Sequence, residues 1–137
     1  MYDIINLEKE KVDIPKRVYV MIDLIRSVIH RNKPDYIVFE DVAMQTNPAT
    51  LILLARLQGA IIGYCRQKKI PYKIFKPSNW RKTLGFRQGA GIKRPELKKQ
   101  AIEYVMEKYG LKLCEDICEA ICLGDAFVKS ENIESED

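Results

Sequence analysis

The sequence has little that would place the chain in or across a membrane. No apolar run approaches the roughly 18 residues of a membrane span, because the longest run, at residues 51–54, is soon followed by Arg56. Residues 1–6 have neither the basic start nor the sustained apolar stretch of a secretory signal peptide. We therefore expect a cytoplasmic protein with no membrane association.

Metal-binding side chains of the soft type are also scarce, with four cysteines and one histidine. Cys114, Cys118 and Cys122 recur every four residues, and Cys65 is the remaining one. A tetrahedral zinc site needs a fourth ligand and normally a turn between pairs of ligands. We expect reduced cysteines that pack as small buried residues, with a zinc or cluster site as the less favoured alternative. His30 lies at a predicted helix end, where an interaction with the helix dipole is the simpler explanation.

Charge is distributed unevenly along a chain of ordinary composition, 47% hydrophobic and 31% charged. Residues 66–99 hold twelve Lys or Arg and one acid, whereas residues 112–137 hold two Lys and eight Asp or Glu. A length of 137 residues predicts one domain over residues 1–137, with a flexible acidic tail at 130–137. Aromatic residues occur among the basic ones, and Trp80 could stack on a base or anchor a short helix to the core. The basic segment favours a nucleic-acid partner over an ordinary solvated face.

The pattern of apolar residues predicts an α/β fold. Residues 36–40 and 70–75 form short apolar runs typical of buried strands, and the apolar segment between them has helical length. Asn47 is placed to cap that helix and Pro48 to begin it. A strand, a helix and a strand with short connections predict a βαβ unit with parallel strands. The helices that we expect are at residues 16–31, 49–68, 79–84, 95–109 and 115–129.

Three carboxylates are candidates for one site. Glu40 ends the first predicted strand, where the strands of an open α/β sheet face the ligand crevice. Asp116 and Glu119 are three residues apart and share a face of the last helix. Acids in a first helical turn also suit the helix dipole, which is the structural alternative for this pair. Together the three acids are suited to Mg²⁺, with Mn²⁺ as a substitute, and to phosphodiester hydrolysis. Asp41 and Asp125 are less favoured as helpers.

Several segments, taken together, resemble a known family. They are the run of residues 36–42, Thr46-Asn47 before an apolar helix with Arg56 and Gly59, Lys76-Pro-Ser-Asn-Trp-Arg-Lys-Thr-Leu-Gly-Phe86, Lys93-Arg94-Pro-Glu-Leu-Lys98, and Asp116-x-x-Glu119-Ala. In order and spacing, over about residues 16–128, they look like RuvC-type Holliday junction resolvases, especially phage-like ones.

The resemblance implies a ribonuclease-H-like fold, with a βαβ core and additional helices. It also implies Mg²⁺-dependent endonucleolytic cleavage of branched DNA, such as a four-way junction, usually by a homodimer. Glu40, Asp116 and Glu119 match the family's catalytic metal ligands, although the family often has Asp at the third position. Arg94, of the Lys93-Arg94 pair, matches a residue near the scissile phosphate. The residues that we expect to bind nucleic acid are Lys76, Arg81, Lys82, Lys93, Arg94 and Lys98.

One family feature has no counterpart in the sequence. The family begins with a strand carrying Gly-x-Asp, whose Asp is a further metal ligand, and nothing similar precedes Tyr36. Asp3 is a poor replacement, because it lacks the glycine context. We expect a member without roughly its first two strands, through a misplaced start or a split gene, that is weakly active or inactive by itself. The alternatives are a non-catalytic nucleic-acid-binding remnant and a ribonuclease-H-like nuclease for RNA processing.

Overall fold

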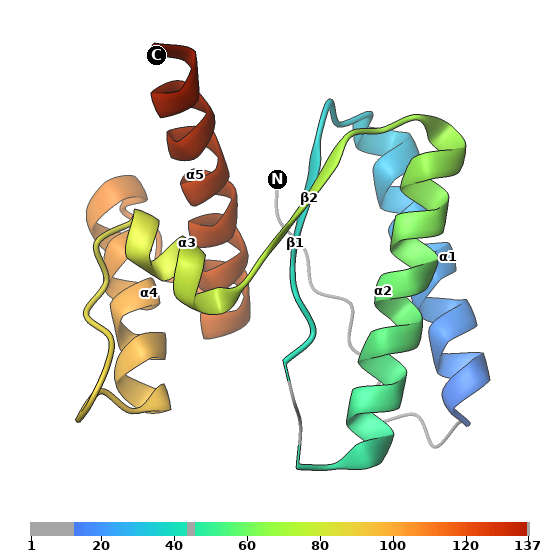
Figure 1. The fold of residues 1–137 in the computed structure, drawn as a ribbon, viewed down its shortest axis with the longest axis horizontal. Coiled ribbons are helices and arrows are strands. Elements are labelled where there is room, and N and C mark those ends of the chain that lie inside the picture. Colours follow the sequence, from blue (N-terminus) through green and yellow to red (C-terminus); the bar gives the residue numbers. More distant parts are fainter. Residues whose placement is uncertain (1–12, 44–45, 137) are drawn as a thin grey trace. The chain divides into compact units, whose positions relative to one another are not determined.

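The computed structural model describes residues 13–43 and 46–136, and its side chains as far as Asn132 (Figure 1). Asp3, the weak candidate for an additional acid, lies outside these residues. The elements in chain order are α1 (Ile14–Asn32), β1 (Ile37–Glu40), α2 (Pro48–Lys68), β2 (Tyr72–Phe75), α3 (Pro77–Thr83), α4 (Arg94–Tyr109) and α5 (Glu115–Glu136). The structure therefore contains every predicted strand and helix, with ends shifted by a few residues.

The strands β1 and β2 form a two-stranded parallel sheet connected through α2, which is the predicted βαβ unit. The chain divides into two compact units, and each strand passes from one unit into the other. One unit contains residues 38–40 and the chain from Ile74 onward, and the other contains α1 and α2. The α/β class is confirmed, whereas the ribonuclease-H-like topology and the single domain stay predictions.

The unit with α1 and α2 is built from two capped helices that lie side by side (Figure 1). The Asp13 carboxylate accepts a hydrogen bond from the Lys16 backbone N–H at 2.8 Å, and the Asn47 side chain accepts one from the Ala49 N–H at 3.0 Å. Such caps satisfy N–H groups that have no partner inside the helix. The helix α1 ends at Asn32, and the next residue, Lys33, has a left-handed backbone (φ 45°) before Pro34.

The sequence analysis expected no segment long and apolar enough to span a membrane. By length and composition, α2 contradicts that expectation. Among the described residues, α2 is the one helix long and apolar enough to cross a bilayer, with a mean hydropathy of 1.3. Only Cys65 along this helix is buried. A single helix of this kind is weak evidence for a membrane protein, so the absence of a membrane partner stays an expectation.

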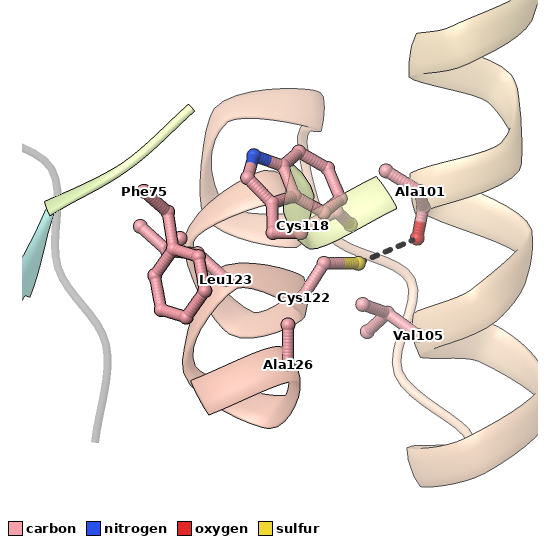
Figure 2. Close-up of a cluster of buried hydrophobic side chains, with 8 residues drawn as sticks. Phe75, Ala101, Val105, Cys118, Cys122, Leu123 and Ala126 are labelled. Atoms are coloured by element: carbon pink, nitrogen blue, oxygen red, sulfur yellow. Dashed lines mark hydrogen bonds between the residues drawn. The ribbon is translucent and has the colours of Figure 1, made fainter. Parts of the chain in front are cut away.

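The other unit has the larger core, in which α3 and α4 both pack on α5. Trp80, Ala101, Val105, Cys118, Cys122 and Ala126 are fully buried there, with Phe75 and Leu123 nearly so. Figure 2 shows the thiol of Cys122 pointing from α5 to the Ala101 carbonyl of α4, 3.9 Å away. Small side chains at every fourth position let these two helices approach closely. The prediction of small buried cysteines is confirmed for Cys118 and Cys122, whereas Cys114 is exposed.

The glycine-containing segment between α3 and α4 is held in place rather than loose. Gln100, which is 8% exposed, accepts a hydrogen bond from the Arg87 N–H at 2.8 Å and donates one to the Arg87 carbonyl at 3.0 Å. The Arg87 side chain also pairs with Glu96 at 2.8 Å. No local sequence pattern predicts these contacts, because the amide of Gln100 comes from α4.

Two helix ends differ from prediction. The helix α3 begins at Pro77 without a side-chain cap, so Ser78 lies inside it instead of before it. The helix α5 continues to Glu136, through residues expected to form a frayed acidic tail. Residues 130–136 are therefore helical, and the flexibility expected of this acidic segment stays a prediction.

Candidate active site

Glu40 is the last residue of β1, and its side chain has a specific partner. Its Oε2 accepts a hydrogen bond of 2.9 Å from the indole Nε1–H of Trp80 in α3. Trp80 is fully buried, whereas Glu40 is an exposed residue. The buried indole and the exposed carboxylate therefore meet at the boundary between the core and the solvent. Sequence reasoning missed this contact, since forty residues separate the two side chains.

Asp116 and Glu119 lie in the first turns of α5, as predicted. Burial raises the pKa of Glu119, and the negative charge of Glu40 raises it further. The cations Arg81 and Lys98 act in the opposite direction, and Asp116 adds a smaller upward contribution. The structure thus places Glu40 and Asp116 each within electrostatic range of Glu119, in one compact unit.

Two of the predicted basic residues face this group of acids. Arg81 is in the last turn of α3, with its guanidinium carbon 5.0 Å from the centre of the Trp80 ring. Its Nε is buried and has no hydrogen-bond partner among the described residues. Lys98, in α4, forms an ion pair with Glu115 at 2.6 Å. A buried guanidinium N–H without a partner is costly, and the role of Arg81 in binding nucleic acid stays a prediction.

The other predicted basic residues lie at helix ends and are exposed. Lys76 immediately precedes α3 and Lys82 is in its last turn, whereas Lys93 precedes α4 and Arg94 begins it. A shallow cavity of about 650 Å³ adjoins this region, lined by Arg94, Pro95, Lys98, Lys99, Ile102, Glu103 and Glu115. The structure leaves all four side chains accessible to a polyanion.

The side chains of the site suit a hard divalent cation by chemistry, because carboxylate oxygens are the ligands that Mg²⁺ prefers. Their arrangement is more open than a finished metal site. Within residues 13–43 and 46–136, no three His, Cys, Asp or Glu side chains converge closely enough to hold a metal ion. The role of Glu40, Asp116 and Glu119 as metal ligands therefore stays a prediction.

The remaining sequence candidates have other surroundings. Asp125 accepts hydrogen bonds from Tyr104 at 3.0 Å, from Lys108 at 2.9 Å and from Tyr109 at 2.7 Å, so it joins α4 to α5. Asp41 accepts hydrogen bonds from the Val42 N–H and the Gln58 side chain. Both acids make local contacts, which was the favoured interpretation for Asp125.

Two further interpretations concern single residues. Trp80 cannot stack on a base in this structure, because its side chain has no exposed surface. Its other predicted role, as an anchor of α3 in the core, is the one that the structure shows. His30 is exposed, in the last turn of α1.

In a comparison with known protein families, one family matches most of this chain. Residues 1–123 match the family described as crossover junction endodeoxyribonuclease RuvC, a span that includes Glu40, Asp116 and Glu119. The chain belongs to the RuvC family. The resemblance inferred from separate motifs is thereby confirmed.

Individual RuvC proteins align over a shorter stretch. The crossover junction endodeoxyribonucleases RuvC of Bordetella parapertussis and Bordetella pertussis are 35% and 37% identical over 51 and 49 residues, or 37% and 36% of this chain. The alignments cover 28% and 27% of the length of those relatives. The activity, substrate and partners of a whole RuvC protein can therefore only be proposed for this chain.

Proposed function

We propose that this chain carries the metal-dependent nuclease site of a crossover junction endodeoxyribonuclease and acts on branched DNA. The observation that supports it most is the shared electrostatic environment of Glu40, Asp116 and Glu119, with Arg81 and Lys98 beside them. Neighbouring negative charges repel one another and are kept together only at some cost. Such clusters occur preferentially at functional sites, and this one lies within the residues that match a nuclease family.

The three carboxylates are the proposed ligands of Mg²⁺, or of Mn²⁺ in its place. Bound there, the cation would activate the attacking water and stabilise the leaving oxygen of the phosphodiester. The chain's own contribution is to hold the acids, and the burial of Glu119 and its proximity to Glu40 favour binding of a positive ion. A cation would offset the repulsion that raises the pKa of Glu119.

Positive side chains are the proposed phosphate contacts. Arg81 lies beside the acid group with a buried Nε that has no partner among the described residues, and Arg94 is the proposed contact near the scissile phosphate. Lys76, Lys82 and Lys93 extend the positive surface along the ends of α3 and α4. Lys98 would exchange its ion pair with Glu115 for a phosphate oxygen, since an ion pair that is partly exposed is weak.

The expected fold, domain organisation, cellular location and oligomeric state are part of the same proposal. The fold is ribonuclease-H-like, in a single domain over residues 1–137, and the protein acts in the cytoplasm as a homodimer. Sedimentation equilibrium of the chain tests the dimer, because a molecular mass of about 15.9 kDa at all concentrations would contradict it. Cleavage by the chain alone is expected to be weak, since no Gly-x-Asp strand precedes Tyr36 in the sequence.

A non-catalytic nucleic-acid-binding remnant is the second candidate. One observation favours it, namely that the described residues contain no ready group of three metal ligands. A remnant would keep the basic residues and bind DNA without any response to Mg²⁺. The two candidates therefore agree on DNA binding and differ in metal-dependent cleavage.

The test compares a labelled four-way junction, a duplex of the same sequence and a structured RNA, each with Mg²⁺ or with a chelator. We expect the junction to bind most tightly, with an affinity that falls as salt increases. Slow cleavage of the junction should require Mg²⁺ and disappear in Glu40→Gln, while Glu96→Gln serves as the control. Binding without any Mg²⁺-dependent cleavage would support the remnant, and preferred cleavage of the RNA would support the RNA-processing alternative.

A further inference from the structure

The hydrogen bond between Trp80 and Glu40 connects a fully buried side chain of the core to a carboxylate of the proposed site. We propose that Trp80 is a positioning residue, whose indole N–H fixes the Glu40 carboxylate in the orientation that binds a divalent cation. This inference rests on the proposed function, because it assigns a role within the same site. It gives Trp80 a role in the site, whereas the sequence suggested only base stacking or anchoring of a short helix.

Breaking the hydrogen bond between Trp80 and Glu40 would be energetically costly. The indole nitrogen of a tryptophan is a donor only, and a buried donor without a partner is energetically costly. Trp80 has no exposed surface, and its Nε1 lies 2.9 Å from Oε2 of Glu40. A bond from a neutral donor to a charged acceptor is also stronger than one between two neutral groups. Trp80 and Glu40 are therefore expected to remain together whenever this unit is folded.

The donor is held more rigidly than the acceptor. The indole packs against Phe86 edge to face, with ring centres 5.6 Å apart, and belongs to the buried cluster formed by α3, α4 and α5. Glu40 is at the exposed end of a strand of four residues. A glutamate in that position would otherwise sample several rotamers. A fixed donor selects among those rotamers, so the core determines where the carboxylate lies.

The contact leaves the carboxylate able to bind a cation. A carboxylate has two oxygens with about four acceptor positions, and the indole uses one of them on Oε2. The carboxylates that ligate metals in proteins are commonly oriented by a hydrogen bond of this kind. The indole N–H itself has no lone pair for a metal, so Trp80 does not compete for the ion. Trp80 also faces Arg81 through its ring, which connects the same side chain to the proposed phosphate contact.

A purely structural role is the competing explanation. In that case Glu40 would only satisfy the indole N–H, and the shape of the tryptophan would be all that α3 needs. The two roles differ in what happens when the N–H is removed and the shape is kept. Metal affinity would fall if Trp80 positions Glu40, and it would stay unchanged if Trp80 only fills space.

The hydrogen bond can be observed separately, because the chain contains one tryptophan. A ¹H–¹⁵N spectrum of the labelled chain should therefore show one indole N–H signal. We expect Glu40→Ala to move this signal upfield, and Glu40→Gln to move it less, since the amide oxygen can still accept. The control Glu96→Gln should leave it in place. A signal that Glu40→Ala does not move would contradict the hydrogen bond.

Metal affinity tests the role. We expect Trp80→Phe to weaken Mn²⁺ binding about 10-fold or more, the usual effect of losing a group that orients a ligand. Replacement of the single tryptophan by benzothienylalanine, which has sulfur in place of N–H, should do the same with the circular dichroism unchanged. Val105→Ala, which loosens the same core and keeps the indole, should retain the wild-type affinity.

The outcomes separate the inference from the function on which it rests. Wild-type Mn²⁺ affinity in the benzothienylalanine protein would overturn the positioning role while leaving the metal site intact. A wild-type chain that binds no Mn²⁺ would contradict the proposed function, and the role of Trp80 with it, even where the indole signal responds to Glu40→Ala. Weakened binding in both tryptophan replacements, together with a signal that moves, would support the inference.

Discussion

Arg81 shows how a single side chain connects the core to the proposed site. Its guanidinium lies over the ring of Trp80, and its buried Nε has no partner among the described residues. Its charge partly offsets the burial and the Glu40 charge that raise the pKa of Glu119. An arginine presents several N–H donors in a plane and suits phosphate oxygens. The sequence placed Arg81 among twelve similar cations, and only the fold distinguishes it from the others.

The first prediction at this scale concerns junction binding. Arg81→Ala should weaken binding to a four-way junction and reduce the slope of log affinity against log salt by about 1, because one phosphate contact is lost. Fluorescence anisotropy at several salt concentrations measures both quantities. Lys112→Ala, an exposed cation outside the proposed set, is the matched control. Equal slopes for the two variants would show that Arg81 makes no phosphate contact.

A second residue-scale prediction separates the cysteines. Burial raises the pKa of Cys118 and raises that of Cys122 to about 12, whereas Cys114 is exposed. Since the thiolate is the reactive form, a higher pKa and burial both slow the reaction. An aromatic disulfide reagent at pH 8 should modify Cys114 rapidly, and Cys65, Cys118 and Cys122 only on unfolding.

The variant Cys114→Ser provides the check on that assignment. Its native protein should lose the fast phase of the reaction, while the denatured protein should still react at the remaining three thiols. A fast phase that survives in Cys114→Ser would mean that a cysteine of α5 or α2 is accessible in the native fold.

At the scale of elements, the end of α4 is joined to α5 by a polar cluster around Asp125. Its carboxylate accepts hydrogen bonds from Tyr104, Lys108 and Tyr109 and is 17% exposed. Burial raises the pKa of Asp125, but the hydrogen bonds from Tyr109, Lys108 and Tyr104 outweigh it, and the net pKa is below the ordinary value. The charged form therefore stabilises the folded protein.

The third prediction follows from the sign of this shift. Asp125→Asn should lower the free energy of unfolding at pH 7 by about 1–3 kcal/mol, because the charged acceptor of these hydrogen bonds becomes a neutral and weaker one. Because the folded pKa is depressed, this contribution is complete above the unfolded pKa of about 3.9 and is lost as the pH falls through the folded pKa. The difference between wild type and Asp125→Asn should therefore shrink in acid.

Urea unfolding at pH 7 and pH 3 measures that difference. Glu103→Gln is the control, because Glu103 forms an exposed pair with Lys99 at 3.9 Å that contributes little. A stability difference for Asp125→Asn that stays constant between the two pH values would contradict the depressed pKa.

How far the sequence predicted these elements depends on whether the deciding interactions were local. The cap at Asn47, the proline at the start of α2 and the strand ending in Glu40 depend on neighbouring residues, and each was predicted. The hydrogen bonds between Gln100 and the Arg87 backbone, and between Trp80 and Glu40, join segments that are distant in the sequence. No local pattern specifies such contacts, so the contacts of Gln100 were not predicted and the role of Trp80 was left open.

At the scale of the whole molecule, the family is established and the site is proposed. Membership of the RuvC family follows from the match over residues 1–123. The fold brings Glu40 of β1 and Asp116 of α5 within electrostatic range of Glu119, while the role of the three acids as one site stays a prediction. The sequence alone could not decide which carboxylates bind a metal, and the reason is physical. A carboxylate at the start of a helix can serve the helix dipole or a metal, and only its distance from other acids distinguishes the two.

The fourth prediction tests the central claim, which is that Glu40, Asp116 and Glu119 hold one divalent cation. The measurement is Mn²⁺ binding by electron paramagnetic resonance, which detects the free ion directly, with the wild-type chain, Glu40→Gln, Asp116→Asn, Glu119→Gln and the control Glu96→Gln. We expect wild type and Glu96→Gln to bind alike, and each of the other three to bind at least about 10-fold more weakly. Equal binding by all five proteins, or none by the wild type, would contradict the claim.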